Sequence, residues 1–367
     1  MSESSSYGTQ EPKLRNTIKN DLKSGDFLKT LKREFRELKS FYINAEKQKR
    51  LGEMNLFKRV IVMFWWILKS MMLKLTPIRR ILLLVGIIFL FTVHINVDSG
   101  NKRSTVNDGL IGTAIIILVL MLELKDKLLA SDELKAGRKV QLALMPEERP
   151  EFPGWSVWLY TEPANDVSGD LIDFINISPD RAGLVMADVA GKGLNAALLT
   201  TKLQATVRAF AADYFCEKLV SKVNSIFYRD SLRNIFASLL YVELTPDSNH
   251  LKYVNAGHMP PLIIKSGNVQ ELNRGEAAIG LMKDVDYSLN TIELERGDVF
   301  IVYSDGVTEA MNEKGEFFGS EKFINLLAKT QSLYPAEIGS LIMSEINKFN
   351  GDNGVTDDLS LIILKKM

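Results

Sequence analysis

The feature that most constrains the fold is the stretch over residues 181–210, RAGLVMADVAGKGLNAALLTTKLQATVRAF. Its apolar run Leu184–Ala187 predicts a buried strand, and that strand ends in an acid, Asp188. Gly191 and Gly193 then allow a sharp turn, and a helix with one apolar face follows. A carboxylate beside bare backbone can bind one cation. Because many proteins have one such corner, its meaning depends on the other acids of the chain.

Charge is distributed unevenly along the chain. The 367 residues have a formal net charge of zero, but residues 1–80 hold 18 Lys+Arg and 8 Asp+Glu, so the remainder is acidic. An acidic body argues against nucleic-acid binding, whereas a basic N-terminal part beside apolar runs favours a membrane surface. The single cysteine, Cys216, excludes an internal disulfide and fits a reducing compartment. Only three histidines are present, which argues against a histidine-rich zinc site.

The N-terminal region, residues 1–58, is polar at its start and then basic. Apolar residues recur at helical spacing over residues 27–45, with lysines and arginines between them. This pattern predicts a basic amphipathic helix that lies on a membrane or against a partner helix. The alternative is an ordinary helix pair with a solvated basic face.

Residues 59–124 contain three apolar blocks, which predict a membrane region. Residues 60–75 include tryptophans and lysines and are expected at the membrane interface. Residues 78–97 and 109–124 are expected to span the membrane, and a buried core hairpin is the alternative. Lys and Arg are concentrated outside this pair of segments rather than in the loop between them. The positive-inside rule therefore predicts a multi-pass protein of the cytoplasmic membrane with both ends in the cytoplasm.

The chain after the membrane region reads as a linker and one globular domain. Residues 125–145 continue as a charged helix with heptad-like apolar positions, which suggests a signalling linker. From residue 146 to residue 367, short apolar strands joined by turn signals alternate with helical blocks. This order predicts an α+β domain in which antiparallel sheets are covered by helices.

Four acidic corners of this domain share one property: each lies where a predicted strand meets a loop. They are Asp170, Asp188, Asp305 and the pair Asp357–Asp358. If the corners converge, cations must offset their mutual repulsion. Oxygen ligands without histidine or cysteine favour Mg²⁺ or Mn²⁺ over zinc, and two such ions can activate water and hold a phosphate. The alternative is that these acids only form turns.

Five motifs occur in this order along the chain: DVSGDLID (166–173), ADVAGKGLNAAL (187–198), NAGHMPPL (255–262), YSDGVTEAMN (303–312) and DDLSLIIL (357–364). Over about residues 141–367 the chain resembles the metal-dependent protein phosphatases that are similar to protein phosphatase 2C, in the branch of sporulation stage II E and RsbU. The resemblance implies an αββα four-layer sandwich, here preceded by an N-terminal membrane hairpin. It also implies two Mg²⁺ or Mn²⁺ ions at one end of the sandwich.

The resemblance also implies roles for single residues. Asp188 would bridge both ions, with the Val189 carbonyl oxygen helping to bind one. Asp305 and Asp357 would hold the second ion, with Asp358 as the rival of Asp357, and Asp170 would lie nearby. Asp188 and Asp305 would thereby activate the attacking water.

Two further residues of the motifs are candidates for contact with substrate. Lys192 could meet the substrate phosphate, and its alternative is a solvated side chain. His258 is a candidate general acid or substrate contact, but the two prolines that follow soon after favour a structural turn. Ala190 stands where eukaryotic-type relatives have a histidine acid, so the proton donor is unassigned. Ser168 and Ser304 replace the usual glycine and threonine of their motifs without removing a ligand.

The expected function is a membrane-anchored, Mg²⁺- or Mn²⁺-dependent phosphatase of phosphoserine and phosphothreonine. By resemblance, its partner would be a phosphorylated anti-sigma-factor antagonist of the STAS type in a partner-switching pathway. Membrane lipid is a further expected partner, and nucleic acid is not expected. The resemblance and the heptad-like spacing also suggest a homodimer through linker and hairpin. The alternatives are a docking module without turnover and a two-metal phosphoesterase with a small-molecule substrate.

Overall fold

The computed structural model describes residues 43, 45–52, 54–91, 96–99, 102–105, 108–230, 235–351 and 354–367. The chain divides into two compact units, Met1–Lys127 and Leu128–Met367. The amphipathic helix predicted over residues 27–45 lies almost wholly outside the described residues.

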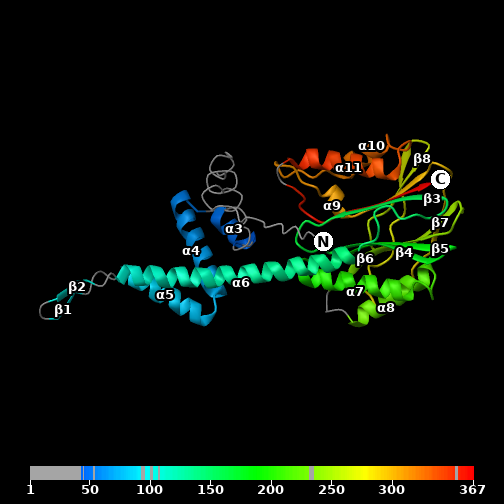
Figure 1. The fold of residues 1–367 in the computed structure, drawn as a ribbon. Helices are drawn as coiled ribbons and strands as arrows, with labels where there is room; N and C mark the ends of the chain where they lie inside the picture. Colours follow the sequence, from blue (N-terminus) through cyan, green and yellow to red (C-terminus); the bar gives the residue numbers. More distant parts are fainter. Residues whose placement is uncertain are drawn as a thin grey trace, which may run out of the picture. The chain divides into compact units, whose positions relative to one another are not determined.

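The described residues of the first unit form helices and one short β-hairpin (Figure 1). α5 and α6 are antiparallel and meet at two glycines. A Cβ atom on Gly112 would lie 2.6 Å from the Gly86 carbonyl oxygen, so a larger residue at this position would separate the two backbones. Arg79 Nη1 lies 2.7 Å from both Glu123 Oε1 and Asp126 Oδ2 and fixes the other end of the pair. The elements are α3 (Ala45–Gly52), α4 (Leu56–Lys74), α5 (Pro77–Phe91), β1 (Asn96–Ser99), β2 (Lys102–Thr105) and the first part of α6 (Asp108–Leu144).

The two predicted membrane spans do not appear as spanning helices. The segment 78–97 was expected to be one helix, but α5 ends at Phe91 and β1 begins at Asn96. These last residues pair with β2 in an antiparallel hairpin, so the expected helical end of the span is wrong. The segment 109–124 is the first part of α6, which continues through the predicted linker to Leu144. Among the residues that the structure describes, no helix has both the length and the apolar character that crossing a membrane requires.

The second unit is built on two five-stranded antiparallel sheets. The first sheet has the order β10-β7-β6-β5-β4 and the second has the order β3-β12-β11-β8-β9. The first sheet contains β4 (Asp170–Ser178), β5 (Arg181–Val189), β6 (Ala237–Leu244), β7 (His250–Ala256) and β10 (Asn290–Glu293). The second contains β3 (Trp155–Glu162), β8 (Leu262–Lys265), β9 (Asn268–Glu271), β11 (Val299–Tyr303) and β12 (Leu359–Lys366).

Helices cover the outer face of each sheet, which confirms the predicted four-layer sandwich (Figure 1). α7 (Leu194–Phe210) and α8 (Cys216–Asp230) pack on the first sheet, while α10 (Ser320–Leu327) and α11 (Pro335–Asn350) cover the second. The central strands alternate between two buried faces, so they are apolar almost throughout. Leu184, Leu240, Phe300 and Ile362 fill the core between the sheets. Burying these side chains gives the sandwich most of its stability.

The last turns of α6 are hydrogen-bonded to one loop of the sandwich. Gln141 Nε2 donates to the Ser168 carbonyl oxygen at 3.0 Å, and the Ser168 N–H donates back to Gln141 Oε1 at 3.1 Å. One turn earlier, Arg138 Nη1 donates to the Asn165 carbonyl oxygen at 3.3 Å. The loop over residues 163–169, which leads into β4, is therefore held by the helix that precedes the domain.

The carboxyl end of α6 is held by a second set of bonds. Gln204 Nε2 and Arg208 Nη2 of α7 both donate to the Leu144 carbonyl oxygen, each at 3.0 Å. Arg208 also makes two charge-assisted bonds to the buried Asp173 carboxylate of β4, at 2.6 and 2.7 Å. Asp173 is therefore a structural acid that joins β4 to α7.

Candidate metal and phosphate site

The Asp188 corner has the predicted strand, turn and helix. β5 ends at Val189, and the Ala190 N–H donates to the Phe236 carbonyl oxygen, which carries the loop past the end of β6. Gly191 has a φ of 125° and Gly193 a φ of 74°. Side chains other than glycine rarely adopt such angles, so these residues let the chain reverse into α7 without strain. The turn leaves Asp188 near the carboxyl end of β5, where it lines an open pocket.

Asp170 lies directly opposite Asp188 because it opens the neighbouring strand β4. Directly paired residues of antiparallel strands point to the same face with Cβ atoms about 5 Å apart. The Thr200 hydroxyl donates to the Gly169 carbonyl oxygen at 2.8 Å, which holds the turn before Asp170 against α7. Asp170 is only 7% exposed, and its Oδ2 has no hydrogen-bond partner among the described residues.

The second sheet contributes the other two corners. β11 ends at Tyr303, and Asp305 opens the single turn α9 (Asp305–Thr308). The Ser304 N–H donates to the Ser360 carbonyl oxygen at 3.0 Å, and the Ser304 hydroxyl donates to the Asp358 carbonyl oxygen at 3.0 Å. A Cβ atom on the residue after Asp305, Gly306, would lie 2.1 Å from that same Asp358 oxygen. The close approach of the two loops therefore requires glycine at position 306.

Asp357 and Asp358 have different surroundings, although they are adjacent. Asp358 Oδ2 accepts bonds from the Gly169 N–H at 2.7 Å and the Ser168 hydroxyl at 2.9 Å, and its Oδ1 accepts from the Ala164 N–H at 2.8 Å. Asp358 thus binds the loop before β4. Asp357 lines the pocket instead, and its Oδ2 lies 3.2 Å from Lys192 Nζ. These bonds favour Asp357 over Asp358 as the metal ligand.

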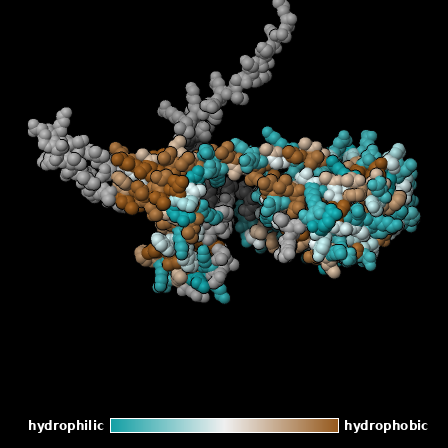
Figure 2. All heavy atoms as spheres, turned by 90° about the horizontal axis from the view of Figure 1, so that it is seen from below, coloured by the Kyte–Doolittle hydropathy of each residue, from teal (hydrophilic) through white to brown (hydrophobic). Residues whose placement is uncertain are grey.

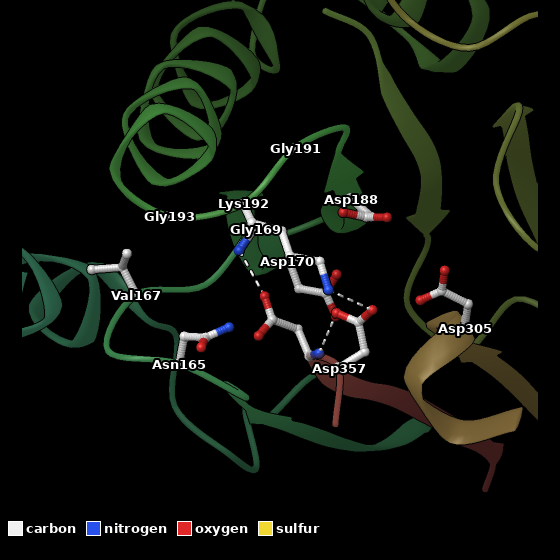
Figure 3. Close-up of a pocket in the computed structure, with 11 residues that line it drawn as sticks. Asn165, Val167, Gly169, Asp170, Asp188, Gly191, Lys192, Gly193, Asp305 and Asp357 are labelled. Atoms are coloured by element: carbon white, nitrogen blue, oxygen red, sulfur yellow. Dashed lines mark hydrogen bonds and ion pairs between the residues drawn. The ribbon is translucent and has the colours of Figure 1, made fainter. Parts of the chain in front are cut away.

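All four corners meet at one pocket of about 170 Å³ (Figure 3). Asp188 and Asp305 lie on one side of the view, Asn165 and Val167 on the other, and Lys192 reaches across to Asp357. The pocket is lined by Asn165, Val167, Gly169, Asp170, Asp188, Gly191, Lys192, Gly193, Asp305, Asp357 and Asp358. Five of these residues are aspartates from two sheets, and one is a lysine.

The carboxylates of the pocket disfavour one another's charge. Burial, followed by the charges of Asp305, Asp357 and Asp358, raises the pKa of Asp188 to about 6. Burial is also the main cause that raises the pKa of Asp170 well above its usual range and that of Asp305 to a smaller extent. Lys192 opposes these shifts at Asp188 and Asp305 but is one cation among five acids. The pocket therefore favours bound cations.

The donor set fits hard divalent cations by its chemistry. The pocket offers carboxylate oxygens and no histidine or cysteine, which favours Mg²⁺ or Mn²⁺. The unpartnered, buried Asp170 Oδ2 is an acceptor that a cation could satisfy. The Val189 carbonyl oxygen lies beside Gly169, where an added Cβ would be 3.4 Å away. In the described part of the chain, however, no three acidic, histidine or cysteine side chains are close enough to hold one ion as they stand.

His258 does not line the pocket. Its ring is buried, and Nδ1 shares a 2.8 Å hydrogen bond with the Ser238 hydroxyl of β6. The Asn255 side chain closes the turn, because its Oδ1 accepts from the His258 N–H at 2.8 Å and its Nδ2 donates to the His258 carbonyl oxygen at 3.1 Å. Burial lowers the pKa of His258 to about 4. This placement favours the structural turn over contact with substrate.

Two residues of the pocket were not singled out from the sequence, Asn165 and Val167. Both belong to the loop over residues 163–169, whose sequence indicated only a turn before Asp170. Asn165 is exposed, and Figure 3 shows its amide directed into the pocket. Lys192 and Asn165 are the lining residues whose side chains have N–H donors. Asn165 could have been found from the sequence as a side chain with N–H donors that lies within a few residues of a predicted ligand, Asp170.

Residues 178–366, just over half of the chain, match the family model described as stage II sporulation protein E (SpoIIE). Protein IcfG of Synechocystis sp. is 26% identical over 304 residues, which cover 73% of this chain and 47% of IcfG. Phosphoserine phosphatase RsbU of Bacillus subtilis is 25% identical over 242 residues, which cover 64% of this chain and 70% of RsbU. The chain thus spans about half of the length of IcfG and more of RsbU.

Solved structures show the same fold. The SiaA-PP2C domain of Pseudomonas aeruginosa superimposes with a TM-score of 0.57 at 20% identity, covering 65% of this chain and 98% of that domain. At this identity the likeness concerns the fold, whereas the family model covers the sequence from the start of the β4–β5 turn to β12. The chain therefore belongs to the stage II sporulation protein E (SpoIIE) family.

Proposed function

We propose that this chain is a metal-dependent serine/threonine protein phosphatase. The observation that carries the proposal is the pocket itself, where five aspartates from the ends of two sheets surround an open space beside one lysine. Membership of the SpoIIE family supports it, as does the similarity to RsbU, which is named a phosphoserine phosphatase. The intact acids Asp170, Asp188, Asp305 and Asp357 argue against a docking module without turnover.

The ions would be held by the residues predicted from the sequence. Asp188, Asp170 and the Val189 carbonyl oxygen would contribute ligands from the first sheet, and Asp305 and Asp357 from the end of the second. When bound, such cations supply positive charge that attracts a phosphate group and activates water for attack. Lys192, whose Nζ lies 3.2 Å from Asp357 Oδ2, would offer its ammonium group to the phosphate.

The chain's own donors would bind and orient the substrate. A phosphate group carries negative charge, so it is repelled by the aspartates and attracted by N–H groups. Lys192 and Asn165 enter the pocket from two different loops and can hold two phosphate oxygens between them. Asp188 and Asp305 line the same pocket and would help to position the attacking water.

The surroundings of the pocket favour a protein substrate over a nucleotide. No aromatic side chain is among the residues that line it, so a base would have no surface on which to stack. We infer that the substrate is phosphoserine or phosphothreonine on a regulatory protein. The resemblance to the RsbU branch makes a phosphorylated STAS-type anti-sigma-factor antagonist the first substrate to test.

The test uses the full-length chain with a phosphoserine peptide, in the presence of Mn²⁺ or of a chelator. We expect phosphate release with Mn²⁺ and none with the chelator. Asp305→Asn, which removes one ligand charge without changing side-chain size, should reduce release to the level seen with chelator. Asp286→Asn, at an exposed position outside the pocket, is the matched control and should leave the rate unchanged. A wild-type chain that releases no phosphate with either Mn²⁺ or Mg²⁺ would contradict the proposal.

We also propose that the first unit binds the cytoplasmic membrane. Figure 2 shows hydrophobic side chains gathered over α5 and the first half of α6. Large exposed apolar patches mark interaction or membrane sites, and basic residues in α4 and α5 would favour anionic headgroups. The exposed side chains of this patch include Ile78, Ile81, Leu84, Ile88, Leu110, Ile117 and Leu120.

Sedimentation with vesicles tests this second proposal. The full-length chain should sediment with vesicles that contain phosphatidylglycerol, and the double variant Ile81→Asp, Ile88→Asp should stay in the supernatant. Phe317→Asp, which places the same charge on an exposed apolar residue of the second unit, is the control and should sediment like the wild type. Wild-type chain that stays in the supernatant would count against the membrane.

A further inference from the structure

A groove lies between α10 and α11, on the outer face of the second sheet. Its volume is about 480 Å³, and none of its lining residues belongs to the aspartate pocket. Phe318, Leu326 and Phe349 form its apolar part, and the two phenylalanine rings have centroids 5.4 Å apart in an edge-to-face arrangement. Phe318 is buried and Phe349 is partly buried, so this part of the groove is a fixed surface.

Three lysines line the groove against one acid. Lys348 Nζ lies 2.6 Å from Glu345 Oε1, so the acid is already paired. Lys322 Nζ lies 4.3 Å from the centre of the Phe349 ring, and Lys329 is exposed. In the described part of the chain, no carboxylate forms an ion pair with Lys322 or Lys329. The groove therefore offers unneutralised positive charge beside an aromatic surface.

The charge of the groove is opposite to that of the chain around it. Residues 81–367 hold ten more acidic than basic side chains. Lysines on a solvated helix face normally pair with nearby acids or point singly into water. A group of lysines around two phenylalanines attracts a segment that combines acidic and apolar side chains.

Both walls of the groove lead back to acid corners of the pocket. On one side, Asp305 opens α9, and the Gly319 N–H donates to the Thr308 carbonyl oxygen of α9 at 2.9 Å just before α10 begins. On the other side, α11 ends at Asn350, and the chain then passes Asp357 into β12. The ends of α10 and α11 that carry Lys322 and Phe349 are thus connected by short segments to Asp305 and Asp357. A protein whose phosphoserine enters the pocket can extend a neighbouring segment along this groove.

We propose that the groove between α10 and α11 docks an acidic segment of the phosphoprotein substrate, with an apolar side chain of that segment packed on Phe318 and Phe349. This inference rests on the proposed phosphatase function. Docking holds the phosphoserine near the pocket at a raised effective concentration, so it lowers KM and leaves kcat unchanged. The attraction is between exposed charges and weakens as salt is added.

Direct binding tests the docking surface without reference to turnover. The probe is a fluorescein-labelled peptide of alternating glutamate and leucine without phosphate, and its anisotropy is titrated with the full-length chain. We expect binding that weakens with salt. The double variant Lys322→Glu, Lys329→Glu should bind at least about 10-fold more weakly, because it replaces attraction with repulsion. Lys218→Glu, Lys283→Glu makes the same change of charge at exposed lysines outside the groove and should bind like the wild type.

Turnover supplies the second readout. With a phosphorylated STAS-domain protein as substrate, the groove variant should show a KM raised at least about 10-fold with kcat retained. Hydrolysis of p-nitrophenyl phosphate, which is too small to reach the groove, should be the same in both chains. Equal peptide binding by the wild type and the groove variant would overturn the docking site, as would equal loss in the control variant. A wild-type chain that hydrolyses neither substrate would instead refute the phosphatase function, while the peptide titration still reports on the groove.

Discussion

At the scale of single residues, the pocket separates side chains that repel phosphate from those that attract it. The aspartates are expected to act through cations, whereas Lys192 and Asn165 can contact the phosphate directly. Asn165 is well placed because its own carbonyl oxygen is held by Arg138 of α6. Its amide is therefore carried on a fixed backbone and does not depend on any ion for its position.

Replacing Asn165 with alanine should weaken phosphate binding while leaving the ions in place. A hydrogen bond to a charged group contributes about 1.5–3 kcal/mol, so we expect KM for a phosphoserine peptide to rise about 10-fold or more. Inhibition by inorganic phosphate should weaken by the same factor, and Mn²⁺ binding measured by calorimetry should not change. Asn176→Ala, on an exposed position of β4, is the control. An unchanged inhibition constant for phosphate would remove Asn165 from the site.

The burial of His258 predicts a dependence of stability on pH. The folded chain lowers the pKa of this histidine from about 6.5 in the unfolded chain to about 4, so folding favours its neutral form. The stabilisation is fully present above pH 6.5 and is lost as the pH falls from there towards 4. Between pH 7 and pH 5 the wild type should lose about 2 kcal/mol more than His258→Asn. Urea unfolding at the two pH values measures this difference, and equal losses would show that the ring is not buried as described.

The sequence identified the pocket's acids but not the hydrogen bonds that distinguish them. Asp357 and Asp358 are adjacent and chemically identical, so no local pattern separates a ligand from a structural acid. The two acids differ because the backbone amides of Ala164 and Gly169 donate to Asp358. These amides are distant in the sequence and contact Asp358 only in the folded chain. Asn165 was missed for the same reason, because a turn residue comes to line a pocket only through the folding of the distant segments around it.

At the scale of elements, α6 is more than a connection between the two units. Gln141 forms two hydrogen bonds with the backbone of Ser168, and that loop also supplies Asn165 and Gly169 to the pocket. A change in the last turns of α6 would therefore disturb the position of the loop over residues 163–169. α6 also contacts α7, the helix that follows the Asp188 loop, because Gln204 and Arg208 donate to the Leu144 carbonyl oxygen.

Gln141→Leu should loosen this loop without disturbing the sandwich. Leucine has a similar size but can neither accept from the Ser168 N–H nor donate to its carbonyl oxygen. We expect the Mn²⁺ concentration for half-maximal activity to rise several-fold, with a melting temperature lowered by only a few degrees, as for the loss of about 1 kcal/mol. Lys139→Ala, at an exposed position two residues earlier, should change neither quantity. If the Mn²⁺ requirement of Gln141→Leu is normal, the contact is structural only.

The elements themselves were largely predictable, and the exceptions have a physical cause. Apolar runs between turn signals located the central strands, because strands buried on both faces leave no other pattern. The spans expected over 78–97 and 109–124 rested on the length of their apolar runs, and such a run does not by itself mark where a helix begins or ends. The chain instead forms β1 and β2 at the tip of the hairpin and continues α6 without a break into the linker.

At the scale of the whole molecule, the clustered acids cost stability when no cation is present. The raised pKa of Asp188 shows that its charge is unfavourable in the folded chain. Asp188→Asn removes this charge, so without divalent ions at neutral pH the variant should be about 1–3 kcal/mol more stable than the wild type. Thermal unfolding with chelator checks this direction.

When Mn²⁺ is added, Asp188→Asn should become less stable than the wild type. Binding to the folded state alone raises the melting temperature of the wild type, and the variant, which lacks one of the proposed ligands, should show little or no rise. A wild-type melting temperature that does not respond to Mn²⁺ or Mg²⁺ would mean that the pocket does not take up ions in the folded chain.

Asp170 and Asp188 lie on one sheet, while Asp305 and Asp357 lie at the end of the other. An ion that binds acids of both sheets would form a reversible cross-link between the two halves of the sandwich. Without it, like charges push the sheet ends apart, and backbone amides near the ends of β5 and β11 should exchange their hydrogens faster. The supply of divalent ions in the cell would then set how long each molecule survives proteolysis as well as how fast it works.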